Sequence, residues 1–205
     1  MRIQIKSGSG PVNPAITKED VKEFGFINSD ERDDDIDSLI NAATIMTEKL
    51  TGRKLITQTW YIYYDQEEFA DRLRTYKNQI VLTTFNVQSI VELLVYKKDN
   101  TSSTIASSNY RQVGDELTSN TRLAFNDDYN LNLSDVRNTD SYRVEVVVGF
   151  GLLQTDIPSS LRDSLRMIIN HWVQFPNKVS ESKTFETPTN YNAAIFSYRS
   201  TEAYF

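Results

Sequence analysis

A change of hydrophobic period between Asp34 and Trp60 constrains the fold of this chain more than any other feature of its sequence. Apolar residues first recur at spacings of three and four, which predicts a helix with one buried face. This apolar face comprises Ile36, Leu39, Ile40, Ala43, Met46, Thr47 and Leu50. From Leu55 the residues become β-branched and aromatic with partial alternation, as is typical of a strand. Gly52 lies between the two patterns, where a left-handed residue can end the helix.

Acidic residues precede this helix. The run Asp33–Asp34–Asp35 places negative charge at the positive end of the helix dipole, which favours a helix start. Alternate aspartates at 33, 35 and 37 also imitate the opening of a calcium-binding EF-hand loop. Ser38 and Thr44, however, occupy the positions where that loop needs a glycine and a bidentate acid. We therefore favour helix capping, with adventitious metal binding as the minor alternative.

Two further helices are predicted on either side of the β region. Thr17 is an N-cap candidate with Asp20 three residues later, and the short helix that follows is expected to end at Gly25. After Gly151, Pro158 suits a first helical turn and Pro176 ends the pattern. The apolar face of this last helix comprises Leu161, Leu165, Ile168, Ile169 and Trp172.

The β region continues as a series of short strands separated by Asn, Asp, Ser and Thr turns. After the strand that begins near residue 55, strands are predicted at 80–83, 89–97, 110–113, 122–125 and 142–150, with polar loops at 98–109 and 126–141. The predicted fold class is α+β, a small helical bundle body with an inserted antiparallel β domain and extended N- and C-terminal arms. The expected boundaries are an N-terminal arm at 1–15, the helical body at 16–54 plus 152–176, the β domain at 55–151 and a C-terminal arm at 177–205.

Composition excludes several functions. The formal net charge of −6 disfavours sequence-independent binding to nucleic acid, which needs clustered Lys and Arg. The chain has no cysteine, so disulfides, thiolate metal sites and cysteine nucleophiles are absent. No apolar run reaches the length of a signal peptide or of a membrane span.

The sequence offers no recognisable catalytic, cofactor-binding or metal-binding motif. His171 is the only histidine, which rules out a multi-histidine metal site within one chain, and we expect it to be structural. No phosphate-binding glycine loop, nucleophile elbow or H-E-x-x-H motif occurs. Nothing selects a glycosidase-like pair among the 28 acidic residues. The chain is therefore not expected to be an enzyme or to need a cofactor.

The C-terminal segment combines irregular sequence with large aromatic side chains. These are Phe185, Tyr191, Phe196, Tyr198, Tyr204 and Phe205. A binding arm could dock such anchors into a protein pocket, or the same residues could pack back onto their own domain. Both interpretations remain open at this stage. A platform for single-stranded nucleic acid is less suitable, because the segment has only three basic residues.

The order of these parts resembles a known family. The most specific piece is the sequence from Leu50 to Trp60, LTGRKLITQTW, which follows Glu48. Weaker pieces are the Thr17–Asp20 helix start, Val87–Ile90 entering a strand, Tyr110–Arg111 starting another, Val146–Gly151 before Ile157–Pro158, and His171–Trp172 in the last helix. Together, over residues 17–175, they resemble the head-to-tail connector, or adaptor, proteins of tailed bacteriophages.

This resemblance implies a structural role. Such proteins form a homo-oligomeric ring, commonly a dodecamer, in the neck of the virion after assembly in the host cytoplasm. The ring joins the portal protein to a downstream neck or tail protein, and genome DNA passes through it without specific binding. The six C-terminal aromatic residues become the expected portal-binding set, with no membrane involved. Alternatives are a stopper or tail-completion neck protein, a tail-associated carbohydrate-binding module suggested by the β region, and, more distantly, a hydrolase.

Overall fold

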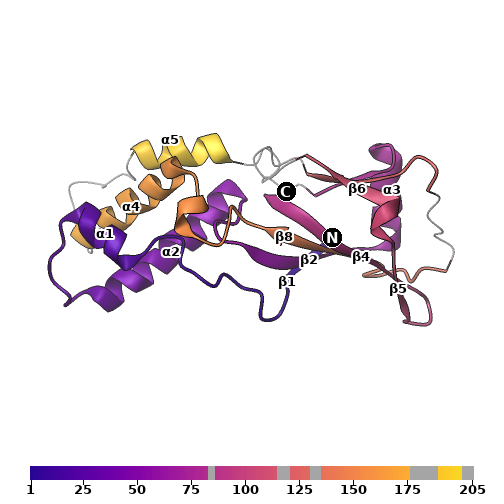
Figure 1. Ribbon diagram of the computed structural model, residues 1–205, viewed down its shortest axis with the longest axis horizontal. Helices are drawn as coiled ribbons and strands as arrows, with labels where there is room; N and C mark the ends of the chain where they lie inside the picture. Colours follow the sequence, from indigo (N-terminus) through magenta and orange to yellow (C-terminus); the bar gives the residue numbers. More distant parts are fainter. Residues whose placement is uncertain (83–85, 115–120, 130–134, 176–188, 200–205) are drawn as a thin grey trace, which may run out of the picture. The chain divides into compact units, whose positions relative to one another are not determined.

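The computed structural model of the chain describes residues 1–82, 86–114, 121–129, 135–175 and 189–199, without the side chains of 189 and 190 (Figure 1). The chain divides into two compact units. The strand unit contains Met1–Gly10 and Thr57–Gly149, and the helical unit contains Pro11–Ile56 and Phe150–Phe205. Each unit thus consists of two separate segments of sequence, and the boundary near residue 56 follows the predicted change of period.

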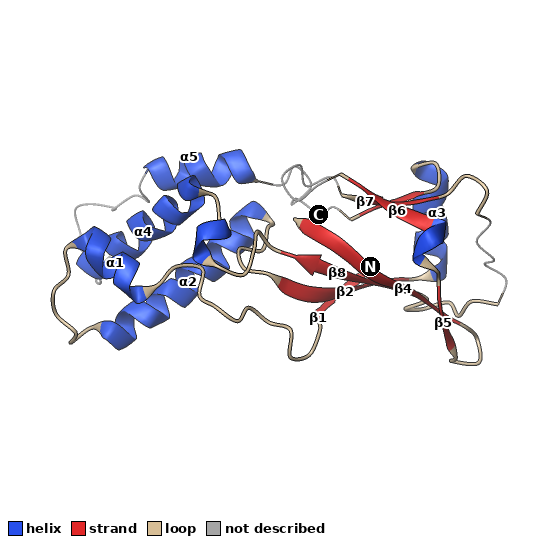
Figure 2. Cartoon of the chain, in the orientation of Figure 1, coloured by secondary structure: helices blue, strands red, loops and turns tan. Residues whose placement is uncertain are grey.

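The helical unit contains the three predicted helices and a fourth that was not predicted, among the described residues (Figure 2). They are α1 (Lys18–Gly25), α2 (Asp33–Thr51), α4 (Ser159–Gln174) and α5 (Thr189–Tyr198). Most residues of the predicted apolar faces of α2 and α4 are buried, and Leu39, Met46, Leu50 and Trp172 are only partly buried. The buried positions that were not predicted are Thr51, Ser164, Asn170 and Val173. No helix in the described part of the chain is long and apolar enough to cross a membrane.

Helix α2 has its acidic run in the first turn and ends at Gly52, as its sequence predicts, but its N-cap residue, Arg32, makes no side-chain capping hydrogen bond. Asp33 lies in the first turn and accepts a hydrogen bond of 2.9 Å from Lys22 Nζ, and this contact, helped by the charge of Lys18, lowers the pKa of its carboxyl. At the other end, Gly52 adopts φ 70° and its N–H donates to Glu48 O at 2.9 Å. A left-handed glycine at this position closes the helix without the steric penalty of a Cβ.

Helix α1 ends at Gly25, as expected, but Gly25 is not its left-handed cap. Thr17 is its N-cap and accepts from Asp20 N at 3.2 Å, as predicted. Gly25 is still helical, and the left-handed conformation falls on Phe26, with φ 52°. The reason is close packing, because a Cβ on Gly25 would lie 1.9 Å from Asn170 Oδ1 on α4. Gly25 is therefore needed for the approach of two helices, and a phenylalanine occupies the capping position.

The strand unit contains two antiparallel sheets within the described residues. The five-stranded sheet has the order β1-β2-β8-β4-β5 and the three-stranded sheet the order β3-β7-β6. The first consists of β1 (Arg2–Ile5), β2 (Gln58–Tyr64), β8 (Tyr142–Val148), β4 (Val87–Tyr96) and β5 (Ser102–Thr104). The second consists of β3 (Gln79–Val81), β7 (Arg122–Phe125) and β6 (Tyr110–Val113). The predicted α+β class is confirmed, and each predicted strand has its counterpart.

Three elements of the strand unit were not predicted. Residues 2–5 form β1 and pair with Trp60–Tyr63 of β2, so the first residues of the expected N-terminal arm belong to the sheet. Strand β5 lies within the expected loop 98–109. Helix α3 (Gln66–Thr75) follows β2 and inserts Phe69 into the core, where its ring stacks on Tyr142 at 3.9 Å. Each is short or strongly polar and gains its stability from a neighbour rather than from its own sequence.

Replacing Gly25 by alanine is expected to destabilise the helical unit by about 1–3 kcal/mol. The new Cβ would force Asn170 to rotate, and Asn170 Nδ2 now donates to Arg166 O at 3.0 Å and to Val21 O at 3.4 Å. Urea unfolding followed by circular dichroism measures the change. Gly10→Ala is the control, since a Cβ there would meet only Ile5 Cδ1 at 3.8 Å. Equal stability of the two variants would contradict this account of Gly25.

Candidate functional site: the seat of the C-terminal helix

The turn from Thr51 to Leu55 follows α2 and is built from contacts back to that helix. Thr51 Oγ1 donates to Thr47 O at 2.8 Å and accepts from Arg53 N at 3.2 Å. Glu48 accepts from Leu55 N at 3.0 Å with one carboxylate oxygen and pairs with Lys54 Nζ at 2.7 Å with the other. The backbone after the helix is thereby held in one conformation. The most specific piece of the sequence resemblance, Leu50–Trp60, thus contains this fixed turn between α2 and β2.

This turn directs the side chain of Arg53 toward the end of α5. Arg53 is only 5% exposed, and its Nε donates to the backbone oxygen of Tyr198 at 2.7 Å. Tyr198 is the last residue of α5, where backbone carbonyls lack partners within the helix. A guanidinium at this position satisfies a carbonyl and places positive charge at the negative end of the helix dipole. Arg53 therefore ties the C-terminal helix to the turn after α2.

The inner face of α5 packs into the core of the helical unit. Tyr191 is fully buried, and its hydroxyl lies 3.2 Å from Thr47 Oγ1 of α2. Burial raises the pKa of Tyr191, against the opposing effect of the hydrogen bond with Thr47. Ile195, one turn further on, is also buried in this core. Thr47 therefore serves both as a residue of the apolar face of α2 and as a polar contact for α5.

Tyr198 makes the second aromatic contact of α5 with the body. Its ring meets that of Phe150 edge-on, with centroids 6.4 Å apart, and its hydroxyl accepts from Ser160 Oγ at 3.3 Å. Phe196, by contrast, is 77% exposed. No residue of α5 is charged, which is unusual for a helix with an exposed face. The outer face of α5 is therefore an uncharged surface with one large apolar side chain.

The six aromatic residues of the expected portal-binding set thus do not form one group. Tyr191 and Tyr198 pack against their own unit, and Phe196 alone of the described members is largely exposed. Phe185, Tyr204 and Phe205 lie outside the described residues. The expectation of an irregular C-terminal arm is wrong for 189–198, which are helical. Arg53 and Thr47 could not be recognised from sequence as contacts of this segment, because their partners lie 145 and 144 residues away.

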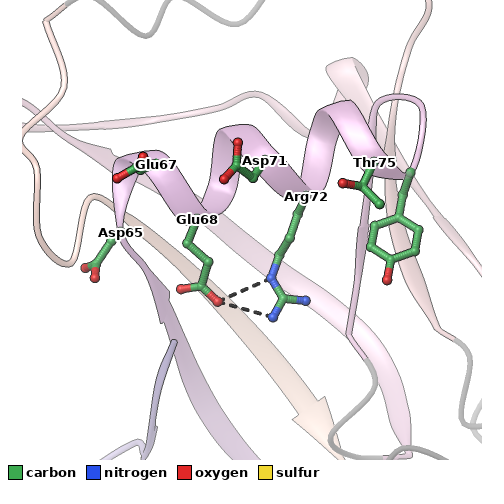
Figure 3. Close-up of a pocket in the computed structure, with 7 residues that line it drawn as sticks. Asp65, Glu67, Glu68, Asp71, Arg72 and Thr75 are labelled. Atoms are coloured by element: carbon green, nitrogen blue, oxygen red, sulfur yellow. Dashed lines mark hydrogen bonds and ion pairs between the residues drawn. The ribbon is translucent and has the colours of Figure 1, made fainter.

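A hollow of 580 Å³ lies beside α3 in the strand unit (Figure 3). Its lining residues are Asp65, Glu67, Glu68, Asp71, Arg72, Thr75 and Tyr76. Glu68 pairs with Arg72 at 3.2 Å and with the N-terminal amine of Met1 at 2.6 Å. The lining of this hollow contains neither a histidine nor a serine that could act as a nucleophile–base pair. It has the character of an acidic surface rather than of an active site.

The aspartates at 33, 35 and 37 and His171, which were also considered from the sequence, make ion pairs or ring contacts within the helical unit. Asp33 and Asp37 both pair with Lys18, at 3.4 and 2.8 Å, and Asp35 pairs with Arg32 at 3.4 Å. These aspartates belong to the first turns of α2, as the helix-start interpretation predicts. The ring of His171 lies 5.3 Å from that of Phe175. No group of three potential metal ligands occurs among the residues that the structure describes.

Comparison with known proteins identifies the family. The family model described as head completion protein, HCP, matches residues 15–197, which include most of both units. The chain belongs to the head completion protein family. This assignment confirms the resemblance to head-to-tail connector proteins of tailed phages. None of the curated proteins compared matches the chain.

Solved structures share the fold of this family member over nearly its whole length. The neck of the empty gene transfer agent (GTA) particle, computed with C6 symmetry, matches with a TM-score of 0.72 at 13% identity. The neck of the native GTA particle, computed with C12 symmetry, and the virion of the native particle each give 0.66, at 14% and 16% identity. Each match covers 98% of this chain and 96% of the other. At these identities the similarity shows a common fold.

Substituting Tyr191 by alanine is expected to destabilise the helical unit by about 3–5 kcal/mol, because it leaves a cavity and an unpaired Thr47 hydroxyl. Phe196→Ala removes a similar ring from the exposed face and is expected to change stability by less than about 0.5 kcal/mol. Chemical unfolding of both variants provides the comparison. If Tyr191→Ala were as stable as Phe196→Ala, α5 would not be seated as described.

Proposed function

We propose that this protein is a structural component of the neck of a phage-like virion, where it forms a ring that joins the portal to the tail side around the DNA channel. The observation that carries this proposal is the match to the head completion protein family over residues 15–197. Its fold, shared along 98% of the chain with proteins from the neck of GTA particles, supports the same role. In this role the protein has no catalytic function of its own.

A ring with C6 or C12 symmetry requires heterologous contacts, in which two different faces of one subunit meet on neighbouring copies. The symmetry of the matched neck structures supports such a ring for this chain, with a dodecamer as the expected form. A formal charge of −6 disfavours tight binding of DNA by the protein. In this proposal DNA passes through the channel of the assembly and is not a ligand that the protein binds.

We further propose that the C-terminal segment binds the portal and that its contact residues are Phe196 with Phe185, Tyr204 and Phe205. Tyr191 and Tyr198 have a different part in this proposal, because they hold α5 on the helical unit and so position Phe196. The uncharged outer face of α5 fits this assignment, since apolar anchors amid uncharged residues contribute most when they are fully desolvated.

Portal binding can be tested with a chain that ends at Arg199, combined with Phe196→Ala. This variant keeps Tyr191, Tyr198 and the Arg53 contact, so it is expected to fold and to form rings in negative-stain microscopy. Its affinity for purified portal rings is expected to fall about 10-fold or more, measured by biolayer interferometry. A deletion from residue 180 would be unsuitable, because it removes Tyr191 from the core. Wild-type portal affinity in the shortened variant would refute the assignment.

The alternative of a stopper or tail-completion protein predicts a different partner order. A stopper or tail-completion protein would bind a separate adaptor ring that lies below the portal, and it would not bind portal rings directly. Microscopy of the purified protein with and without portal separates the two roles. Binding of glycans by the single chain, with no ring, would instead favour the carbohydrate-binding alternative.

A further inference from the structure

The negative charge of the chain is concentrated in one stretch of the helical unit. Residues 18–37 contain nine acidic and three basic side chains, a net charge of −6, which equals the formal charge of the whole chain. The remainder therefore has no net charge. This stretch comprises α1, the start of α2 and the connection between them (Figure 1). Several of its acids, among them Glu23, Glu31 and Asp34, are exposed and make no ion pair with any described residue.

Two phenylalanines are exposed on this acidic stretch. Phe26 is 89% exposed, more than any other large hydrophobic residue of the described chain, and Phe24 is 43% exposed. An aromatic side chain left in water contributes no burial to the fold of the single chain. The neighbouring apolar residues Val21 and Ile27, by contrast, are packed in or against the core. The side chains on either side thus pack into the core of the helical unit, whereas that of Phe26 points into solvent.

The backbone conformation of Phe26 closes helix α1, but this cap does not require a phenylalanine side chain. Phe26 has φ 52°, and its N–H donates to Glu23 O while Ile27 N donates to Lys22 O at 2.9 Å. These are the two bonds of a helix C-terminal cap, which glycine or asparagine makes without the strain of a bulky residue at positive φ. A phenylalanine at this position is a worse cap than asparagine and is also exposed, so neither the helix end nor the core of the single chain accounts for it.

We propose that Phe26, with Phe24 beside it, is an anchor that inserts into an apolar pocket on another protein of the particle, and that this pocket is rimmed by Lys and Arg. This inference rests on the proposed function only for the identity of the particle. Large aromatic anchors surrounded by charged rims are the usual centre of a protein interface. The acidic surroundings specify the sign of the partner's rim and speed its approach.

The charge of residues 18–37 also argues against three other binding partners, namely nucleic acid, an anionic membrane and a second copy of this chain. Nucleic acid and anionic membranes would be repelled by a surface of net charge −6. A second copy of this chain would bring the same acidic stretch, its remaining residues carry no net charge to attract it, and the hollow beside α3 is lined by four acids and one arginine. The partner is therefore a different, basic-rimmed protein, and its contact lies on the helical unit but not on α5.

The decisive variant is Phe26→Asn, which removes the anchor and supplies a residue suited to the left-handed conformation. Its thermal stability is expected to equal or exceed that of the wild type, and its rings and portal affinity are expected to be unchanged. The probes are the purified neck and tail-tube proteins of the same particle, each titrated against the full-length chain by calorimetry at two salt concentrations. One of them is expected to bind, more weakly at high salt, and to lose about 30-fold in affinity with Phe26→Asn.

Val12→Asn is the matched control, since Val12 is 82% exposed in the same unit but lies outside the acidic stretch. It is expected to bind the probe as the wild type does. The double variant Glu23→Lys, Glu31→Lys is expected to slow association of the same probe. The proposal is overturned if no probe binds the wild type, if Phe26→Asn binds as tightly, or if Phe26→Asn alters only self-association. If the wild-type protein formed no rings or did not bind the portal, that result would instead count against the proposed function.

Discussion

The turn after α2 is the constraint on which the rest of the helical unit depends. Gly52 ends the helix, and Glu48 bonds both the backbone of Leu55 and the side chain of Lys54. Once this turn is fixed, Arg53 points at the C-terminal end of α5 rather than at solvent. A buried guanidinium is tolerated only where its N–H groups find acceptors, so the position of α5 and the conformation of the turn stabilise each other. Two segments about 145 residues apart are thereby joined.

The elements that sequence predicts well are those whose own residues determine them. Helix α2 has a full apolar face, a charged first turn and a glycine cap, and the predicted 34–50 differs little from the observed Asp33–Thr51. Strands β2, β4 and β8 are rich in aliphatic and aromatic residues and form the centre of the large sheet. Their local preference and their tertiary environment agree, which is the condition under which a pattern can be interpreted without a structure.

The elements that sequence misses are those that neighbours impose. Among the described side chains of helix α5, only those of Tyr191 and Ile195 are buried in the core, too few for a periodic signal. The helix depends on contacts with Thr47 and Arg53. Strand β1 is largely exposed and exists because β2 offers it an edge. The close approach of Asn170 to Gly25, the last residue of α1, likewise depends on a distant helix. Distant packing is absent from any local pattern.

The candidate contact residues differ from the core residues in being exposed in the single chain. A protein whose role is assembly gains binding free energy from groups that the single chain leaves unsatisfied, whereas its stability comes from groups that are already buried. In the helical unit these two classes are separated residue by residue: Tyr191 is buried while Phe196 faces outward, and Gly25 packs while Phe26 projects. Each exposed phenylalanine lies next to a position that fixes its backbone. A side chain held in this way loses little entropy when a partner covers it, so rigid support of an exposed anchor favours binding. The same helices can thus provide a stable body and two separate contacts with different partners.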